Sequence, residues 1–278
     1  MKCKSCGHSF KGTYCNQCGE KVIDQKDRQL RHFFGEVVAA FTFADTKFWR
    51  SVKLLITSPG RLSSDYAQGI RQRYMKPVSL FFLANFVYFL YPTFDVFTTR
   101  LYSQSHYFYY SDEVTRLVEE RVEQKAISYE AYETEYNQKT AELSKLLLML
   151  MVLIISISVW ILHIRSKRLF ADHLLISLEF FSFMLIYSII GFGTLMLIAV
   201  KTGEYFGHDL KFLFDEEVIL VLPVVISTFV YFFFRAERTF YQASIGWAIA
   251  RSILLIAAFY YSLMIYRWFL FYITYWSV

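Results

Sequence analysis

Apolar residues come in long blocks along this chain rather than at the regular intervals of a soluble core. The clearest block runs from Pro77 to Phe97 and contains a single charged residue, Asp95. A run of about 20 apolar residues is long enough to cross the hydrocarbon core of a bilayer as a helix. The pattern therefore predicts a membrane-spanning helix that follows a basic, water-facing N-terminal part.

Four more apolar blocks predict four further spans. We expect these over residues 146–164, 174–200, 218–234 and 248–266. The last block continues beyond 266, and its Arg251 and Arg267 stand sixteen positions apart. Because a helix rises about 1.5 Å per residue, they lie about 24 Å apart, and each can extend its charged group to an opposite face of the membrane. We therefore expect residues 268–278 to turn along the outer interface.

The distribution of charge gives these spans an orientation. Residues 1–76 contain 14 Lys/Arg against 6 Asp/Glu, a balance of +8, whereas residues 98–143 contain 5 against 9, a balance of −4. Cytoplasmic segments of membrane proteins carry the excess of Lys and Arg. We therefore expect a cytoplasmic N-terminus without a signal peptide, an extracytoplasmic loop at 98–143 and, with five spans, an extracytoplasmic C-terminus.

The acidic loop at 98–143 carries two helix signals. Ser111 is expected to cap a helix that runs to about Ala126, and Ser128 to cap a second helix that continues towards the second span. Three tyrosines recur at helical spacing on this second helix: Tyr129, Tyr132 and Tyr136. The loop should therefore form a helical hairpin over the bundle.

All the cysteines of the chain lie in its first 18 residues, as two C-x2-C pairs: Cys3, Cys6, Cys15 and Cys18. A C-x2-C turn directs two thiolates at one point, and two such turns make a closed tetrahedral site of the structural zinc type. The alternatives are two disulfides, which a cytoplasmic location disfavours, and redox thiols, which need a βαβ setting. We therefore predict a zinc ribbon over residues 1–21 that holds one structural Zn²⁺.

Residues 22–76 are basic and amphipathic. Apolar residues recur there at i, i+3 and i+4, which predicts helices that start near Asp45 and at the Ser58-Pro59 pair. Three basic residues stand immediately before the first span: Arg71, Arg73 and Lys76. Each basic residue near an anionic membrane surface contributes about 1 kcal/mol, so these are candidate ligands of anionic lipid head groups. The alternative is that these helices pack on the cytoplasmic ends of the bundle.

Polar residues within a membrane span are costly and are therefore candidate functional groups. The candidates here are Asn85, His173, Glu179 and Arg251. We expect Asn85 to hydrogen-bond to a neighbouring helix. Glu179 and Arg251 stand at matched depth in their spans, which predicts that they pair, unless each extends separately to the interface. Asp172 and His173 should cap their helix, and the alternative for His173 is proton relay or metal binding.

Three passages together resemble one family. They are the double C-x2-C at 3–18, TSPGRLSSDYAQGIRQRYMKPVSLFF at 57–82 and ADHLLISLEFFSF at 171–183. They are similar to the bacterial membrane proteins catalogued as domain of unknown function 3667. The resemblance implies a zinc ribbon joined to a multi-pass protein of the bacterial inner membrane, and it implies no activity. Members often have His where this chain has Glu179 and Phe181, so any site formed by those histidines is missing here.

The sequence therefore predicts an all-α fold, a polytopic membrane bundle of about five spans in residues 77–278 with a small four-cysteine zinc ribbon. The first hypothesis is a non-enzymatic adaptor, anchor or sensor whose ribbon and basic helices dock a cytoplasmic protein or anionic lipids. The second is a transporter or channel that uses Glu179 and Arg251, for which a polar cavity is required. The third is a membrane enzyme acting on lipid. No Gly-x-Ser-x-Gly or His-Glu-x-x-His motif occurs, and nucleic acid is the weakest partner class.

Overall fold

The computed structural model describes residues 2, 6–12, 14–17, 46–70, 73–90, 97–207 and 217–278. The chain divides into two compact units, Met1–Trp49 and Arg50–Val278. Residues 50–76 fall in the same unit as the predicted spans. Asp45, Arg71 and Asp95 lie outside the described residues.

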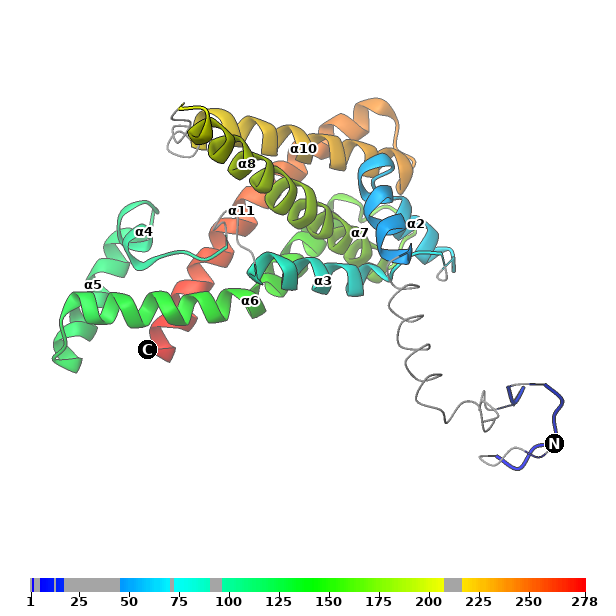
Figure 1. Ribbon diagram of the computed structural model, residues 1–278, viewed down its shortest axis with the longest axis horizontal. Coiled ribbons are helices and arrows are strands. Elements are labelled where there is room, and N and C mark those ends of the chain that lie inside the picture. The colour runs from blue at the N-terminus through cyan, green and yellow to red at the C-terminus, as the bar shows by residue number, and fades with distance from the viewer. Residues whose placement is uncertain are drawn as a thin grey trace. The chain divides into compact units, whose positions relative to one another are not determined.

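Helices are the regular secondary structure of the second unit in its described residues (Figure 1), which confirms the all-α class for that part of the chain. Residues 46–57 form a helix that crosses the boundary between the two units. The elements that follow are α2 (Arg61–Ala67), α3 (Pro77–Leu90), α4 (Leu101–His106), α5 (Ser111–Lys125), α6 (Tyr129–Leu162), α7 (Phe170–Phe183), the π-helix η2 (Met184–Gly191), α8 (Phe192–Tyr205), α10 (Glu217–Thr239) and α11 (Ile245–Ser277).

Among the described residues, three stretches of helix are long and apolar enough to cross a membrane. They are Tyr129–Leu162, Phe170–Tyr205 and Ile245–Ser277; the first covers all but the last two residues of the predicted second span, and the others contain the predicted third and fifth spans. The predicted first span contains α3, a shorter apolar helix of 14 residues, and α10 covers the predicted fourth. The length and composition of these helices support a membrane protein, and the number of five spans stays a prediction.

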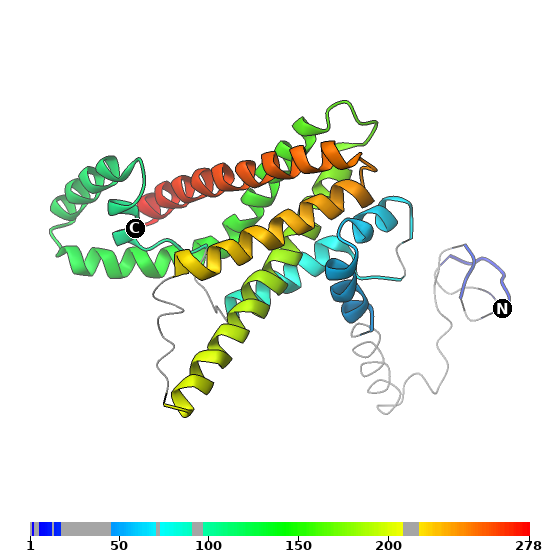
Figure 2. The same cartoon turned by 90° about the horizontal axis from the view of Figure 1, so that it is seen from above.

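Helix α11 corrects one prediction, because it continues without interruption from Ile245 to Ser277. The expected turn after residue 266 is therefore wrong. Leu270, Phe271 and Thr274 lie on one face of the helix and are buried, and the Thr140 hydroxyl of α6 donates a hydrogen bond to the Thr274 hydroxyl at 3.1 Å. The end of α11 thus remains helical because it packs along α6, which runs beside it (Figures 1 and 2).

The predicted hairpin at 98–143 is present as α4, α5 and the first turns of α6. Ser128 caps α6 as expected, since its hydroxyl accepts a hydrogen bond from Ala131 N at 3.3 Å. Ser111 is not a cap but the first residue of α5; its hydroxyl instead accepts from Phe108 N and donates to Gln104 O, both at 2.9 Å. The hairpin therefore starts with a tighter turn than a simple helix cap makes.

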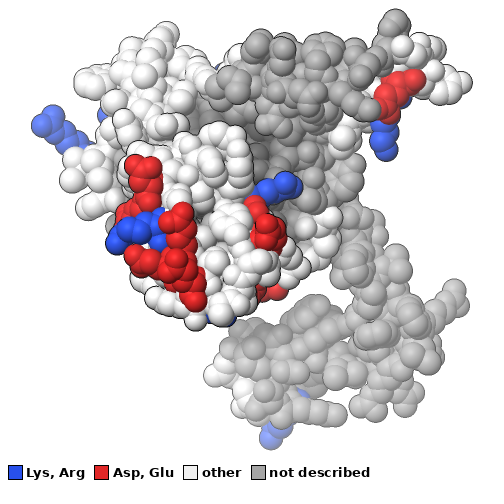
Figure 3. Space-filling view, turned by 90° about the vertical axis from the view of Figure 1, so that its left-hand side faces the viewer, with Lys and Arg blue, Asp and Glu red and all other residues white. Residues whose placement is uncertain are grey.

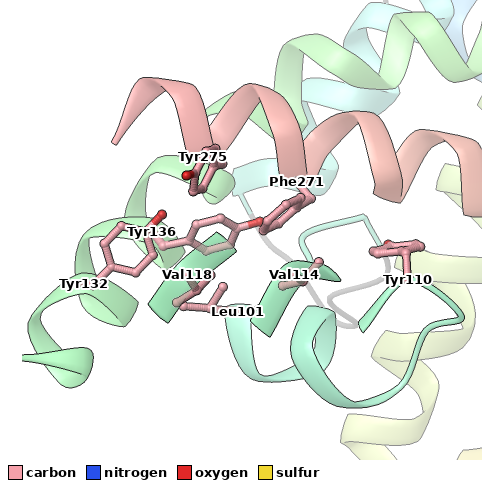
Figure 4. Close-up of a cluster of buried hydrophobic side chains, with 8 residues drawn as sticks. All are labelled: Leu101, Tyr110, Val114, Val118, Tyr132, Tyr136, Phe271 and Tyr275. Atoms are coloured by element: carbon pink, nitrogen blue, oxygen red, sulfur yellow. The ribbon is translucent and has the colours of Figure 1, made fainter. Parts of the chain in front are cut away.

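A cluster of buried side chains joins this hairpin to the end of α11 (Figure 4). Its members are Leu101, Tyr110, Val114, Val118, Tyr132, Tyr136, Phe271 and Tyr275. Tyr132 and Tyr136 are fully buried, whereas Tyr129 stays 39% exposed. Burial raises the pKa of the Tyr110 hydroxyl, which donates a 2.7 Å hydrogen bond to Gln104 Oε1. The opposite face of the hairpin is acidic (Figure 3), with exposed carboxylates along α5 at Asp112, Glu113, Glu119, Glu120 and Glu123.

The interior of the bundle is packed with phenylalanine rings. Helix α11 packs against α6 and α10, and α7 packs against α6 and α3. The ring of Phe180 on α7 has its centroid 4.4–5.6 Å from five other Phe rings: Phe181, Phe229, Phe232, Phe233 and Phe259. Such pairs contribute about 0.5–1.5 kcal/mol each beyond the area that they bury. This aromatic core holds α7 against α10 and α11, and so positions the polar groups described below.

Candidate functional site

Glu179 lies in the middle of α7 and is completely buried. Its Oε1 accepts a hydrogen bond from Gly60 N at 2.8 Å, and its Oε2 accepts one from Ser63 N at 2.7 Å. The first N–H groups of a helix have no partner within that helix, and they form its positive end. The Glu179 carboxylate therefore does for α2 what the side chain of an N-cap residue usually does. We call Glu179, Gly60 and Ser63 the Glu179 site.

Gly60 is the N-cap residue of α2, and two features of its position require glycine. Its φ is +82°, in the left-handed region that residues with a Cβ adopt at a cost. A Cβ on Gly60 would also lie 2.9 Å from the Cα of Ala236 on α10. The expected helix start at Ser58-Pro59 is thus displaced to Gly60, because Glu179 supplies the cap from another helix.

Side chains of the bundle donate hydrogen bonds to backbone carbonyl groups of the helix formed by residues 46–57. The Tyr231 hydroxyl of α10 donates to Ile56 O at 2.5 Å, and the Arg235 guanidinium donates to Thr57 O at 3.4 Å. The Tyr187 hydroxyl of η2 donates to Val52 O. Tyr231 and Arg235 satisfy carbonyl groups of the last turn, which lack partners within the helix, whereas Tyr187 binds a carbonyl one turn earlier. The segment before the first span is therefore held by α7, η2 and α10 together.

The predicted contact between Glu179 and Arg251 is wrong. Arg251 pairs instead with Glu237 of α10, and 3.3 Å separates its Nη1 from Oε2 of that carboxylate. Glu237 lies beyond the predicted fourth span, which ends at residue 234, whereas α10 continues to Thr239. A signal was available, since Phe229, Phe233 and Glu237 follow one another at i, i+4 and so share one helix face.

Glu237 is 1% exposed and also binds His163, which caps the C-terminal end of α6. The Nε2 atom of His163 lies 2.9 Å from Oε1 of the carboxylate, and its Nδ1 lies 2.8 Å from Val159 O. A carbonyl oxygen only accepts, so Nδ1 carries a proton. Glu237 therefore has two side-chain partners, the His163 ring and the Arg251 guanidinium.

Tyr241 connects this pair to His173. Its ring stacks on that of His163 with 3.6 Å between centroids, and its hydroxyl lies 2.7 Å from Nδ1 of His173. Burial, together with the negative charge of Glu237, raises the pKa of the Tyr241 hydroxyl, so the hydroxyl stays protonated. We call His163, His173, Glu237, Tyr241 and Arg251 the Glu237 cluster.

Two expectations about single polar residues are confirmed. Asn85 Nδ2 of α3 donates to Lys145 O of the neighbouring α6 at 3.4 Å. Asp172 caps α7, since its Oδ2 accepts from Leu169 N at 3.2 Å. His173 is fully buried and contacts Tyr241, so it lies within the bundle rather than at an exposed helix end.

Of the three candidate lipid ligands, Arg73 and Lys76 are exposed, as contact with head groups requires, and Arg71 lies outside the described residues.

Two of the four cysteines are described, and their geometry fits a zinc site. The Sγ atoms of Cys6 and Cys15, one from each C-x2-C pair, lie 3.7 Å apart. Four thiolates about 2.3 Å from a zinc ion at the corners of a tetrahedron lie about 3.8 Å from one another. Cys3 and Cys18 fall outside the described residues, within which no group of three potential metal ligands forms a site. The zinc ion therefore stays a prediction.

Taken together, the second unit is an all-helical assembly with three helices suited to cross a membrane. The model of the family described as "Protein of unknown function (DUF3667)" matches residues 45–89, so the resemblance to this family is confirmed over that segment. The backbone groups that Glu179, Tyr187 and Tyr231 bind all lie within the matched segment. No curated protein and no solved structure matches the chain.

Proposed function

We propose that this chain is a non-enzymatic protein of the bacterial inner membrane, with five spans and a cytoplasmic N-terminus, that anchors a zinc-dependent docking module. The module is residues 1–21, in which Cys3, Cys6, Cys15 and Cys18 hold one structural Zn²⁺. Its partner is a cytoplasmic protein. Bound zinc supplies folding free energy to a segment too small to build a core of its own.

The observation that carries this proposal is the pair of hydrogen bonds that the Glu179 carboxylate accepts. A buried carboxylate in a transporter faces the path of its substrate. Here both oxygens bind backbone N–H groups of α2, so the charge holds the segment that precedes the first span. A bundle that binds the segment before its first span in this way suits a protein that anchors what precedes that segment.

The packing of the bundle favours an anchor over a transporter. Phe180 and Phe181, the neighbours of Glu179 in sequence, are fully buried among other rings. The void lined by Ser177, Glu237 and Tyr241 measures about 10 Å³. That is room for about one water molecule. Glu179 and Arg251, the groups expected along a polar path, are each bound to other partners within the protein.

The zinc content of the purified full-length chain tests the module. We expect one zinc per chain in the wild type and none in Cys15→Ser/Cys18→Ser, with thermal unfolding of the bundle unchanged. Cross-linking in cells followed by purification should recover a cytoplasmic protein with the wild type and not with this double variant. Wild-type protein without zinc, or the same partner on both proteins, would contradict the proposal. Tyr14→Phe, which alters the module outside its cysteines, is the matched control and should behave like the wild type.

A further inference from the structure

An open pocket of about 450 Å³ lies between the end of α6 and the start of α11. Its floor contains His163 and Tyr241 of the Glu237 cluster, and its walls carry Arg165, Ser166, Trp247 and Arg251. The turn after α6 supplies two of these residues and the first turns of α11 supply the other two. The pocket is therefore built from the ends of two helices that are suited to cross a membrane.

The polar groups of the pocket suit an anion with several oxygen atoms. Arg165 is exposed and has no ion-pair partner among the described residues. Arg251 is held beside Glu237, and its guanidinium has five N–H donors, only some of which that carboxylate can occupy. Guanidinium groups are donors that proteins commonly direct at phosphate.

The apolar residues at the rim of the pocket indicate that it lies at a membrane interface. Ile164, Trp247 and Leu254 line it and are each more than half exposed. Two further residues of α11, Ile249 and Ile253, continue the exposed apolar surface. Trp is enriched at the level of the lipid head groups, and exposed aliphatic side chains beside it face acyl chains. The rim thus offers a place for the hydrocarbon part of a ligand whose charged part enters the pocket.

We propose that this pocket binds the phosphate group of an anionic phospholipid, which Arg165 and Arg251 contact while Ile164 and Leu254 contact the acyl chains. The inference rests on the membrane location in the proposed function, and it is independent of the zinc module. The site is distinct from Arg73 and Lys76, which stand on an exposed surface. The basic residues around it, including Lys167 and Arg168, favour the leaflet that is rich in anionic lipid.

Native mass spectrometry of the purified full-length protein, titrated with phosphatidylglycerol or phosphatidylcholine, tests this site. The key variant is Arg165→Gln, because no hydrogen bond or ion pair joins this side chain to another described residue and its loss should leave folding unchanged. Removing one charge-assisted hydrogen bond should weaken phosphatidylglycerol binding about tenfold. The matched control is Lys167→Gln. It removes a positive charge two residues further along the chain, at a position that does not line the pocket, and should change phosphatidylglycerol binding less than about twofold.

Three outcomes would overturn the inference. Equal binding of the two lipids would exclude a head-group site. Equal losses in Arg165→Gln and Lys167→Gln would indicate diffuse attraction to surface charge. Displacement of bound phosphatidylglycerol by inorganic phosphate at comparable concentration would indicate a site for a soluble anion. Zinc content and partner recovery, measured on the same samples, separate this result from the proposed function, because Arg165→Gln should leave both at the wild-type level.

Discussion

Two buried carboxylates of this bundle, Glu179 and Glu237, are stabilised by different means. Glu179 binds backbone N–H groups at the start of another helix, and no cationic side chain contacts it among the described residues. Glu237 binds side chains, the His163 ring and the Arg251 guanidinium. A site built from backbone groups depends on the path of the chain, whereas a site built from side chains depends on which residues the helices carry. The two should therefore respond differently to substitution.

The largest effect is expected from Gly60→Ala, which changes the backbone of the Glu179 site. The added Cβ would meet the backbone of Ala236 at 2.9 Å, and φ is +82°. Backbone strain and overpacking together should lower the free energy of unfolding by about 4 kcal/mol, measured by thermal or denaturant unfolding in detergent. Gly69→Ala is the control, since φ there is +90° but the space is open, and it should cost about 1 kcal/mol. Equal effects of the two variants would show that contact with Ala236 is unimportant.

A smaller loss is expected when Glu179 is replaced by glutamine. The amide NH₂ group then faces a backbone N–H, so one of the two hydrogen bonds is lost and the other becomes neutral. Hydrogen bonds to charged groups contribute about 1.5–3 kcal/mol, so Glu179→Gln should cost about 3 kcal/mol of unfolding free energy. Glu237→Gln should cost about 1 kcal/mol less, because Arg251 is partly exposed and can turn to water. The reverse order would mean that ion pairing stabilises the bundle more than the α2 cap.

A double-mutant cycle distinguishes the observed ion pair from the one expected on sequence grounds. Glu237→Gln and Arg251→Gln should show a coupling free energy of about 1–2 kcal/mol, because the two groups are in contact. Glu179→Gln and Arg251→Gln should be additive to within about 0.5 kcal/mol. Coupling in the second cycle but not the first would restore the Glu179–Arg251 pair and overturn the arrangement described here.

The smallest effect is expected from Tyr241→Phe in the Glu237 cluster. Losing the hydrogen bond to His173 should cost about 1 kcal/mol at neutral pH. Burial raises the pKa of Tyr241 above its ordinary value of 10.0, so the native state keeps a proton that the unfolded chain releases above that pH. Stability therefore falls as the pH rises above about 10, by at most about 1.4 kcal/mol per pH unit for one proton.

Unfolding measured between neutral and alkaline pH tests the role of Tyr241. The variant should lose part of the alkaline decline that the wild type shows. Tyr205→Phe, at an exposed position, should keep the full decline. An unchanged slope in Tyr241→Phe would show that this hydroxyl is not held protonated.

Local features could be read from the sequence alone because each depends on residues close together in the chain. Long apolar blocks predicted five spans, three of which lie in described helices suited to cross a membrane, and the Ser128 and Asp172 caps each bind a group three residues away. Asn85 was expected to bond to a neighbouring helix because few other partners exist inside a membrane. The two C-x2-C pairs likewise predict a zinc site from spacing alone.

The features that only the tertiary structure decided all join distant parts of the chain. Glu179 and Gly60 are 119 residues apart, and nothing near either residue indicates that one caps the helix of the other. Glu237 rather than Glu179 became the partner of Arg251 because α10 continues one turn further than its apolar block suggests. The end of α11 stays helical because α6 lies beside it to bury its apolar face. In each case several partners are acceptable locally, and the packing of the helices decides between them. The periodicity of apolar residues does not specify that packing.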